Sequence, residues 1–423
     1  MPHTIEVVVS MTVSEEDYDV NRLEARVRGV RDQTGRALFV RALERLDEMA
    51  REAHPGAVRQ RRVERRLDTT LGPVVFSRWR VQSAGHANCL LDRLLGLPRS
   101  SRVSPAVKKR GCELAARMTY REAARVLSEE LGTPLRAASV HRWVQEVGAV
   151  VQAQELAADV GSSSSGPSAA GRELVVAEID DTPVRSQQPG EEKLFLKLGI
   201  AYSQKRRVGK QKRWELSDKL VYGGVESAEE FGERFYVRVE QEFAVERAGH
   251  VLVKGDGAEW IHQLAEHMFP RHVFQLDRWH LLDRLAMLLG HEPRLWKRLR
   301  RWVYQGRVGA LVQALRQWVG ADARSEQARQ ELLGYITRHR EAITAVDRLR
   351  PRVSAAARPL LTHGTGAMEK NVEVWIGRRF KRWGMRWTRA GAQHLLKLRL
   401  WIHRRGANWF EALHHGQTQL TNA

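Results

Sequence analysis

The sequence predicts an α/β protein with a mixed β-sheet flanked by helices, interrupted by an all-helical insertion and preceded by a helix-turn-helix domain. Three observations support this fold class. Apolar runs of strand length alternate with helical patterns within residues 173–280. Residues 281–355 carry almost only helical periodicity, and three amphipathic helical segments follow one another within residues 101–150.

The composition favours a large protein with a polyanionic partner. The chain has 423 residues, enough for several domains, and a net charge of +20 from 70 Lys and Arg against 50 Asp and Glu. Its cations cluster, for example in 205–207, 297–301 and 378–382, which favours nucleic acid over a merely soluble basic protein. No run of 18 apolar residues predicts a membrane span, and the N-terminus lacks the pattern of a secretory signal. Two isolated cysteines, Cys89 and Cys112, fit a reducing cytosol.

Residues 1–100 predict a small α+β region without evident chemistry. We expect a strand at 5–11 and a helix at 36–50. A hairpin is predicted at 67–81, with its turn at Leu71-Gly72-Pro73.

Residues 101–150 predict a helix-turn-helix DNA-binding domain. Gly132-Thr133-Pro134 separates the second helix from a third, whose apolar side chains repeat at helical spacing. The opposite face of the third helix offers side chains suited to phosphates and base edges: Arg136, Ser139, His141, Arg142 and Gln145. The alternative is an ordinary three-helix packing unit. Residues 151–172, with the run GSSSSGPSAAG, predict a linker.

The C-terminal part predicts a split sheet domain. Strands are expected at 174–184, 193–202 and 219–224, with an exposed basic loop at 203–217 and a helix at 227–243. The first part of this core, 173–280, is followed by the helical insertion, 281–355. The C-terminal helices of the core, 356–405, then lead to a tail at 406–423. Within the insertion, LWKRLRRWVY predicts a helix that could lie along a DNA backbone through Lys297, Arg298, Arg300 and Arg301. The alternative is a bundle helix with a solvated basic face.

Three acidic residues lie at the end of a predicted strand or at the start of a predicted helix. Asp180 ends a predicted strand, Asp256 ends another between two glycines, and Glu369 opens a helix after a Gly-rich turn. Taken singly, each has a structural explanation as a turn residue or a helix-start acid. In this order and in a basic chain, they match the arrangement of an RNase H-like core. Three converging carboxylates could hold two Mg²⁺ ions, which serve phosphoryl transfer on DNA.

Four motifs add a family resemblance. The segments Glu178-Ile179-Asp180, GDGAEWI at 255–261, LDRWH at 276–280 and GAME at 366–369 resemble motifs of ISLre2- and ISKra4-type insertion-sequence transposases. The segment Gly384-Met385-Arg386-Trp387 is similar to the ISKra4 type in particular. The resemblance covers residues 70–410, including the helix-turn-helix.

The resemblance implies a DDE transposase, a DNA endonuclease and strand-transfer enzyme that acts in DNA recombination. Asp180, Asp256 and Glu369 would be the catalytic metal ligands for two Mg²⁺ ions, which Mn²⁺ could replace. The partners would be the terminal repeats of the element and target DNA, with no membrane and with a homo-oligomer formed on DNA. The setting would be the nucleoid of a prokaryotic cytoplasm.

Some assignments stay open at this point. The family usually has Gly after the first acid, where this chain has Asp181, so Asp181 competes with Asp180 as ligand. Glu373 competes with Glu369, one helical turn away. Asp277 and His280 are expected to support the site or contact DNA. Alternative functions are an inactive, transposase-derived DNA-binding protein and a structure-specific nuclease on the same core.

Overall fold

A computed structural model of the chain describes residues 4–83, 86–160, 172–210, 213–364 and 366–413. The chain divides into two compact units, one up to Glu146 and one from Val147 onward. The predicted mixed sheet with flanking helices is confirmed. Within the described ranges, no helix combines the length and apolar character needed to cross a membrane.

The first unit begins with one long helix against an antiparallel sheet. Helix α1 (Val20–Glu52) is followed by β1 (Val58–Thr69), β2 (Gly72–Ser83), β3 (His86–Asn88) and the short α2 (Leu90–Leu94), with strand order β1-β2-β3. The helix expected at 36–50 is therefore longer. The strand expected at 5–11 was wrong: this segment has no regular structure and pairs with none of these strands. The hairpin turn lies at Thr70-Leu71, because Thr69 pairs with Gly72, whose φ is +101°.

Three helices complete this unit. Helix α3 (Pro105–Ala115) is capped by Ser104, and α4 (Tyr120–Leu131) is capped by Thr119 and ends at Gly132 in the left-handed region. Helix α5 (Ala137–Val160) crosses the boundary between the units. Residues 151–160, predicted as linker, are thus helical, and the rest of that segment up to residue 171 lies outside the described residues.

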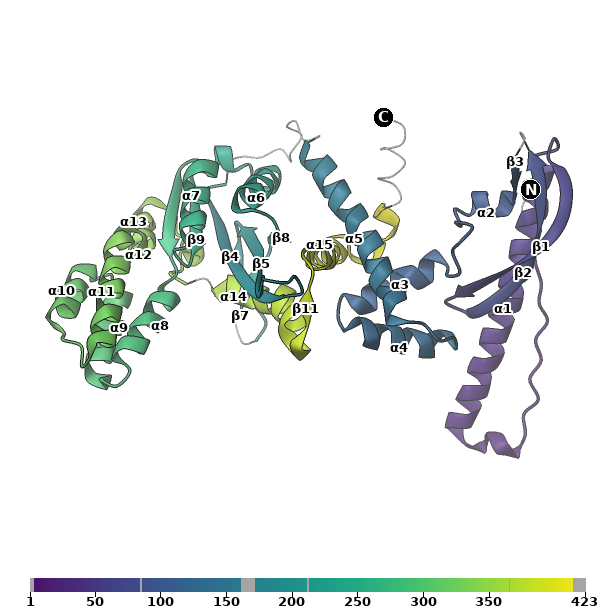
Figure 1. Ribbon diagram of the computed structural model, residues 1–423, viewed down its shortest axis with the longest axis horizontal. Helices are drawn as coiled ribbons and strands as arrows, with labels where there is room; N and C mark the ends of the chain where they lie inside the picture. The colour runs from purple at the N-terminus through teal and green to yellow at the C-terminus, as the bar shows by residue number, and fades with distance from the viewer. Residues whose placement is uncertain (1–3, 84–85, 161–171, 211–212, 365, 414–423) are drawn as a thin grey trace. The chain divides into compact units, whose positions relative to one another are not determined.

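The second unit is built on one mixed sheet with the order β10-β9-β4-β5-β8 (Figure 1). Strand β5 (Lys193–Tyr202) runs antiparallel to both of its neighbours, β4 (Leu174–Ser186) and β8 (Leu220–Gly224), whereas β9 (His250–Gly255) and β10 (His272–Leu276) run parallel to β4. A short strand, β11 (Arg386–Trp387), pairs with the far end of β4. The basic loop expected at 203–217 instead contains a small hairpin, β6 (Lys205–Val208) and β7 (Arg213–Leu216).

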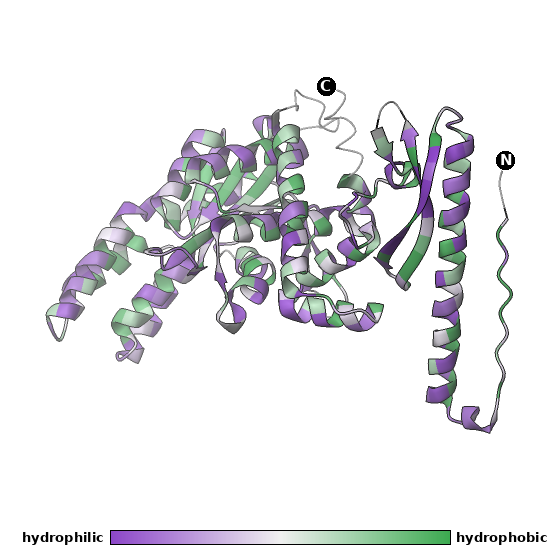
Figure 2. Cartoon of the chain, turned by 45° about the vertical axis from the view of Figure 1, so that its right-hand side comes forward, coloured by the Kyte–Doolittle hydropathy of each residue, from purple (hydrophilic) through white to green (hydrophobic). Residues whose placement is uncertain are grey.

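Different helices cover the two faces of this sheet (Figure 1). Helices α6 (Ala228–Phe243) and α7 (Glu259–Met268) pack on one face through aromatic and aliphatic side chains, including Phe231, Phe235 and Ile261. The other face carries α14 (Gly366–Val372), a π-helical segment (Glu373–Lys381) and α15 (Arg389–Arg405). Figure 2 shows the strands mostly in green, the colour of hydrophobic residues, because both of their faces are covered.

A group of helices follows β10, over the residues for which a helical insertion was predicted. It comprises α8 (Arg278–Leu289), α9 (Pro293–Tyr304), α10 (Val308–Gln317), α11 (Ala323–Arg338), α12 (Arg340–Ile343) and α13 (Ala345–Leu349). The buried Arg278 guanidinium donates to the backbone oxygens of Ile343 and Tyr304 and pairs with Asp347. The start and the return of the insertion also meet, since the Arg278 N–H donates to His363 O at 3.3 Å.

Candidate functional site

Three aspartates converge at the ends of neighbouring strands. Glu178 of β4 pairs with Lys254 of β9, and Gly255 pairs with Leu276 of β10. Continuing these registers by one or two residues places Asp180, Asp256 and Asp277 in adjacent positions. Burial, then the carboxylates of Asp256 and Asp181, with a smaller part from Asp277, raise the pKa of Asp180 to about 7. The sheet therefore gathers acids that the sequence separates by up to 97 residues.

The turn after β9 fixes the second acid. Gly257 has φ +88°, and a Cβ there would lie 2.7 Å from Leu276 Cδ1, so the turn requires glycine. Asp256 Oδ1 accepts from the Ala258 N–H at 2.9 Å, while its other carboxylate oxygen has no hydrogen bond within the described residues. Tyr335 of α11 donates its hydroxyl to Asp256 O at 2.8 Å. The helical insertion thus supports this turn directly.

Asp180 and Asp181 occupy opposite faces of β4. Asp180 shares the face of Glu178, which α14 covers, whereas Asp181 shares the face of the core residue Ile179. Burial and the Asp256 carboxylate raise the pKa of Asp181, while the Lys197 ammonium and a hydrogen bond from Trp260 lower it. This geometry favours Asp180 as the residue that faces the acidic cluster, although Asp256 is close enough to influence both.

A buried ion pair lies beside the acids and was not identified from the sequence. Glu178 and Lys254 have side chains that are 1% and 0% exposed, and Lys254 Nζ lies 3.3 Å from Glu178 Oε1. The same oxygen accepts from the Tyr202 hydroxyl at 2.7 Å, and Lys254 also donates to Thr362 at 2.8 Å. The signal available in the sequence was the alternation that puts Glu178 on the face of Asp180.

Glu178 also fixes the helix that carries the third predicted acid. Its Oε2 accepts from the Met368 N–H of α14 at 2.8 Å. Glu369 follows at once, but its side chain is exposed and forms no hydrogen bond or ion pair within the described residues. Among all the residues that the structure describes, no three acidic, His or Cys side chains are spaced to hold a metal ion. The structure thus brings together Asp180 and Asp256, and it anchors the start of α14 without placing Glu369 beside them.

The alternative third acid is engaged elsewhere. Glu373 begins the π-helical segment, where its carboxylate lies 3.2 Å from Arg382 and 3.6 Å from Arg378. Its Oε2 also lies against Gly377, whose absent side chain leaves it room. The rest of this motif is structural: Arg379 is fully buried with its guanidinium 5.1 Å from the Trp387 ring, and Lys381 bonds Thr182 of β4.

The two residues expected to support the site differ in their surroundings. Asp277 is 1% exposed and caps α8, with its Oδ1 accepting from the Trp279 N–H at 2.9 Å. Its contribution to the raised pKa of Asp180 shows that it lies within electrostatic reach of the cluster. His280 is half-buried on α8, edge to face with Trp279 at 5.0 Å.

The side chains predicted to contact DNA are largely accessible in each unit. In the first, Arg136, His141 and Arg142 are exposed, while Ser139 and Gln145 are half-buried. Arg142 lies 3.6 Å from Glu146, and the His141 ring contacts Tyr120 at 5.1 Å. In the second unit, one basic face of α9 consists of exposed Lys297, Arg298, Arg300 and Arg301. None of these four forms an ion pair within the described ranges, and α9 carries no acidic side chain.

Comparison with known proteins places the chain in a family. Residues 13–415 match the model of an uncharacterised protein family, UPF0236. A UPF0236 protein of Caldanaerobacter subterraneus subsp. tengcongensis is 22% identical over 390 residues, which cover 90% of this chain and 78% of the relative. A UPF0236 protein of Streptococcus gallolyticus, named for the vanSb 3′ region, is 24% identical over 90% of this chain and 82% of its own length. A further relative from Caldanaerobacter, 22% identical over 90% of this chain and 77% of its own, has a name that joins eleven designations. The chain belongs to the uncharacterised protein family UPF0236.

Proposed function

We propose that the protein is a metal-dependent DNA transposase of an insertion sequence, of the ISLre2 or ISKra4 type. The observation that carries the proposal is the convergence of Asp180 and Asp256 at the ends of adjacent parallel strands in a strongly basic chain. Phosphoryl transfer on DNA needs such carboxylates close to the scissile phosphate, together with cations that bring the polyanion to them.

The topology of the second unit supports an RNase H-like core. Three antiparallel strands, β4, β5 and β8, are followed by the parallel strands β9 and β10, and the first acid lies on the central strand. The second acid ends the adjacent strand β9, and the third predicted acid lies on α14 beside β4. The helices α8 to α13 lie between the second acid and the third in the sequence, where the resemblance leads us to expect an insertion into this core.

The donor set fits divalent magnesium. Asp180, Asp256 and Glu369 supply hard oxygen ligands, and the crowding that raises the pKa of Asp180 is relieved when cations neutralise the cluster. Two bound Mg²⁺ ions, or Mn²⁺ in their place, would activate the attacking oxygen and stabilise the leaving one. The chain's own part is to hold these carboxylates on β4, β9 and α14. Glu178 keeps α14 against β4. The exposed Glu369 would have to turn toward the aspartates to complete the set of ligands.

Other features support DNA as the partner. Helices α3, α4 and α5 have the order of a helix-turn-helix with exposed Arg136, His141 and Arg142, which would bind the terminal repeats. The basic face of α9 would contact DNA phosphates. The relative whose name joins eleven designations from one organism also suits this function, since repeated copies are expected of a mobile element. Pairing of two element ends implies a homo-oligomer on DNA, in the nucleoid.

The test is metal-dependent nicking of DNA that carries candidate element ends, with Mg²⁺ and with EDTA. Asp256→Asn keeps the oxygen that accepts from Ala258 but removes the charge, and it should abolish nicking. Asp283→Asn is the matched control, because Asp283 lies on α8 and has no hydrogen bond or ion pair within the described residues. Nicking that persists in Asp256→Asn would refute the assignment. A shift of DNA mobility in EDTA with no nicking in Mg²⁺ would instead indicate a DNA-binding protein.

A further inference from the structure

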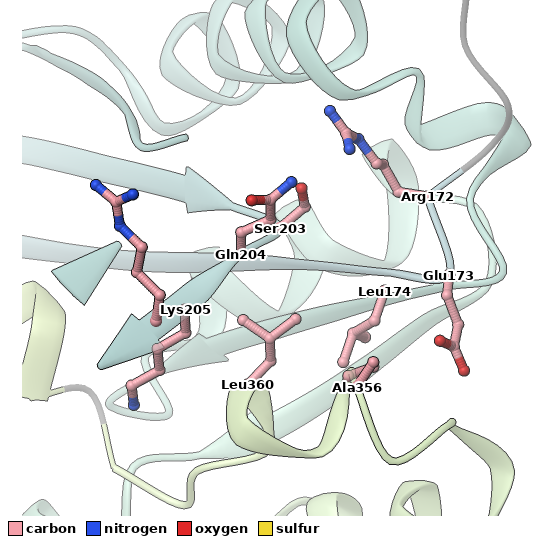
Figure 3. A pocket seen from close by; sticks show the side chains of 10 residues that line it. Arg172, Glu173, Leu174, Ser203, Gln204, Lys205, Ala356 and Leu360 are labelled. Atoms are coloured by element: carbon pink, nitrogen blue, oxygen red, sulfur yellow. The ribbon is translucent and has the colours of Figure 1, made fainter. Parts of the chain in front are cut away.

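A pocket of about 330 Å³ opens at the start of β4, away from the acids (Figure 3). Figure 3 shows Leu174 and Leu360 on one side, Ser203 and Gln204 across from them, and Arg172 and Lys205 at opposite sides. The volume lies at the lower end of the range of roughly 300–1,000 Å³ that ligand pockets span. It suits one nucleotide.

The walls of the pocket are fixed by contacts of their own. Asp218 Oδ1 accepts from the backbone N–H groups of Ser203 and Gln204 at 3.1 and 3.0 Å. Leu174 and Leu360 are 2% and 4% exposed, so they form a buried apolar side against which a flat ring could pack. The pocket is therefore a formed feature of the fold.

The charge of the lining selects an anion. Arg172 and Lys205 form no ion pair within the described residues, whereas the Glu173 carboxylate is occupied by the Ser354 N–H and hydroxyl. Arg206 adds a third cation, which is 3.4 Å from Glu215. An apolar side combined with cations matches a base joined to its phosphates.

An aromatic platform stands next to the pocket on the β6–β7 hairpin. Trp214 is 46% exposed, and Lys205 and Arg207 of the neighbouring strand lie 5.2 and 4.9 Å from the centre of its ring. Exposed aromatic rings flanked by cations are the surfaces on which bases of single strands stack.

The pocket lies on the same face of the sheet as the acids. Leu174 and Asp180 are six positions apart on β4, an even separation, so their side chains share one face. Six positions along a strand correspond to about 20 Å. The segment that follows the insertion runs along this face, with Leu360 in the pocket, Thr362 bonded to Lys254 and Met368 bonded to Glu178. The pocket and the acids therefore lie at opposite ends of β4, on the same side of the sheet.

We propose that this pocket holds one unpaired nucleotide of the bound DNA strand, with its two flanking phosphates at Arg172 and Lys205 and its base against Leu174 and Leu360. The inference rests on the proposed DNA substrate and adds a second recognition point for it. It means that the protein binds a locally unpaired duplex better than a fully paired one, because extrusion of a base already in a bulge costs little.

The test compares two short fluorescent duplexes, one fully paired and one with a single unpaired thymidine, by anisotropy in EDTA with the full chain. The bulged duplex should bind about tenfold more tightly. Ala356→Trp fills the pocket from an exposed position and should remove the preference. Ala355→Trp is the matched control, because Ala355 is also exposed but does not line the pocket, and it should keep the preference. An unchanged Tm verifies that both variants fold.

Three results would overturn the inference. They are equal binding of both duplexes by the wild type, a preference that survives Ala356→Trp, and competition by free deoxythymidine monophosphate as strong as by the bulged duplex. The last would assign the pocket to free nucleotides. Because the assay contains no metal, its outcome is independent of the nicking test, and either proposal can fail alone.

Discussion

Neutralising Asp180 should stabilise the metal-free protein. Burial and the neighbouring carboxylates raise the pKa of Asp180 from 3.8 to about 7 in the folded chain. An acid with a raised folded pKa contributes stability that is complete below its unfolded pKa and is lost as the pH rises through the folded value. Asp180→Asn cannot ionise, so above that window it avoids the repulsion that the wild type carries.

The size of the effect follows from the two pKa values. Each tenfold change in proton affinity corresponds to about 1.4 kcal/mol, so the separation from 3.8 to about 7 sets an upper limit of about 4 kcal/mol. Relaxation of the side chains lowers this to an expected gain of about 2–4 kcal/mol at alkaline pH, or roughly 4–10 °C in Tm. The gap between variant and wild type should widen from about pH 4 to about pH 7, between the unfolded and the folded pKa, and then level off.

Thermal unfolding in EDTA across this pH range provides the assay. Glu369→Gln is the control: it removes another predicted ligand, but from an exposed position, and should leave the metal-free Tm unchanged. Millimolar Mg²⁺ should then raise the Tm of the wild type and not that of Asp180→Asn. A gap that does not change with pH, or a variant less stable than the wild type at alkaline pH, would refute the electrostatic reasoning.

Three further predictions concern the frame around the acids. Glu178→Gln removes the partner of the fully buried Lys254 and should cost about 3–5 kcal/mol in urea unfolding; Lys254→Met added to it should recover much of the loss, and unchanged stability of the single variant would argue against the buried pair. Gly257 has a φ of +88°, and the Cβ of Gly257→Ala would lie 2.7 Å from Leu276 Cδ1. This variant should therefore lower the Tm by an amount equivalent to about 1–3 kcal/mol, whereas an unchanged Tm would show that the turn adapts. Arg300→Ala with Arg301→Ala should reduce the slope of log affinity for DNA against log salt by about 2 without changing the Tm, and a slope equal to that of the wild type would exclude the α9 face from DNA contact.

The sequence was sufficient for the strands and turns that position Asp180 and Asp256. Alternation along β4 and the glycines on both sides of Asp256 are local signals, and the structure places these residues on adjacent strands. The preference for Asp180 over Asp181 rested on the same alternation, and the opposite faces of the two side chains agree with it.

Features that depend on tertiary contacts could not be predicted in this way. Lys254 follows the apolar residues of its strand, so the sequence suggests that its side chain reaches solvent. Its burial could not be predicted, because its partner Glu178 is 76 residues away in sequence. The basic segment that forms β6 and β7 was expected to be a loop, since its charges hide the pairing of Arg206 with Glu215. The place of Glu369 depends on how α14 seats on β4, which no local pattern specifies.

The contact between the two ends of the helical insertion has a consequence for how proteins of this kind can diverge. Arg278 N–H donates to His363 O, so the chain leaves the sheet and returns to it at one point. The length of a segment closed in this way costs only a logarithmic amount of entropy. Helices could therefore be added or removed between these two residues at little cost in loop entropy, provided that the contacts of α8 and α11 with the sheet are kept. The number of residues between Asp256 and Glu369 can then vary among relatives. Searches for distant relatives should give more weight to the residues around Arg278 and His363 than to this number.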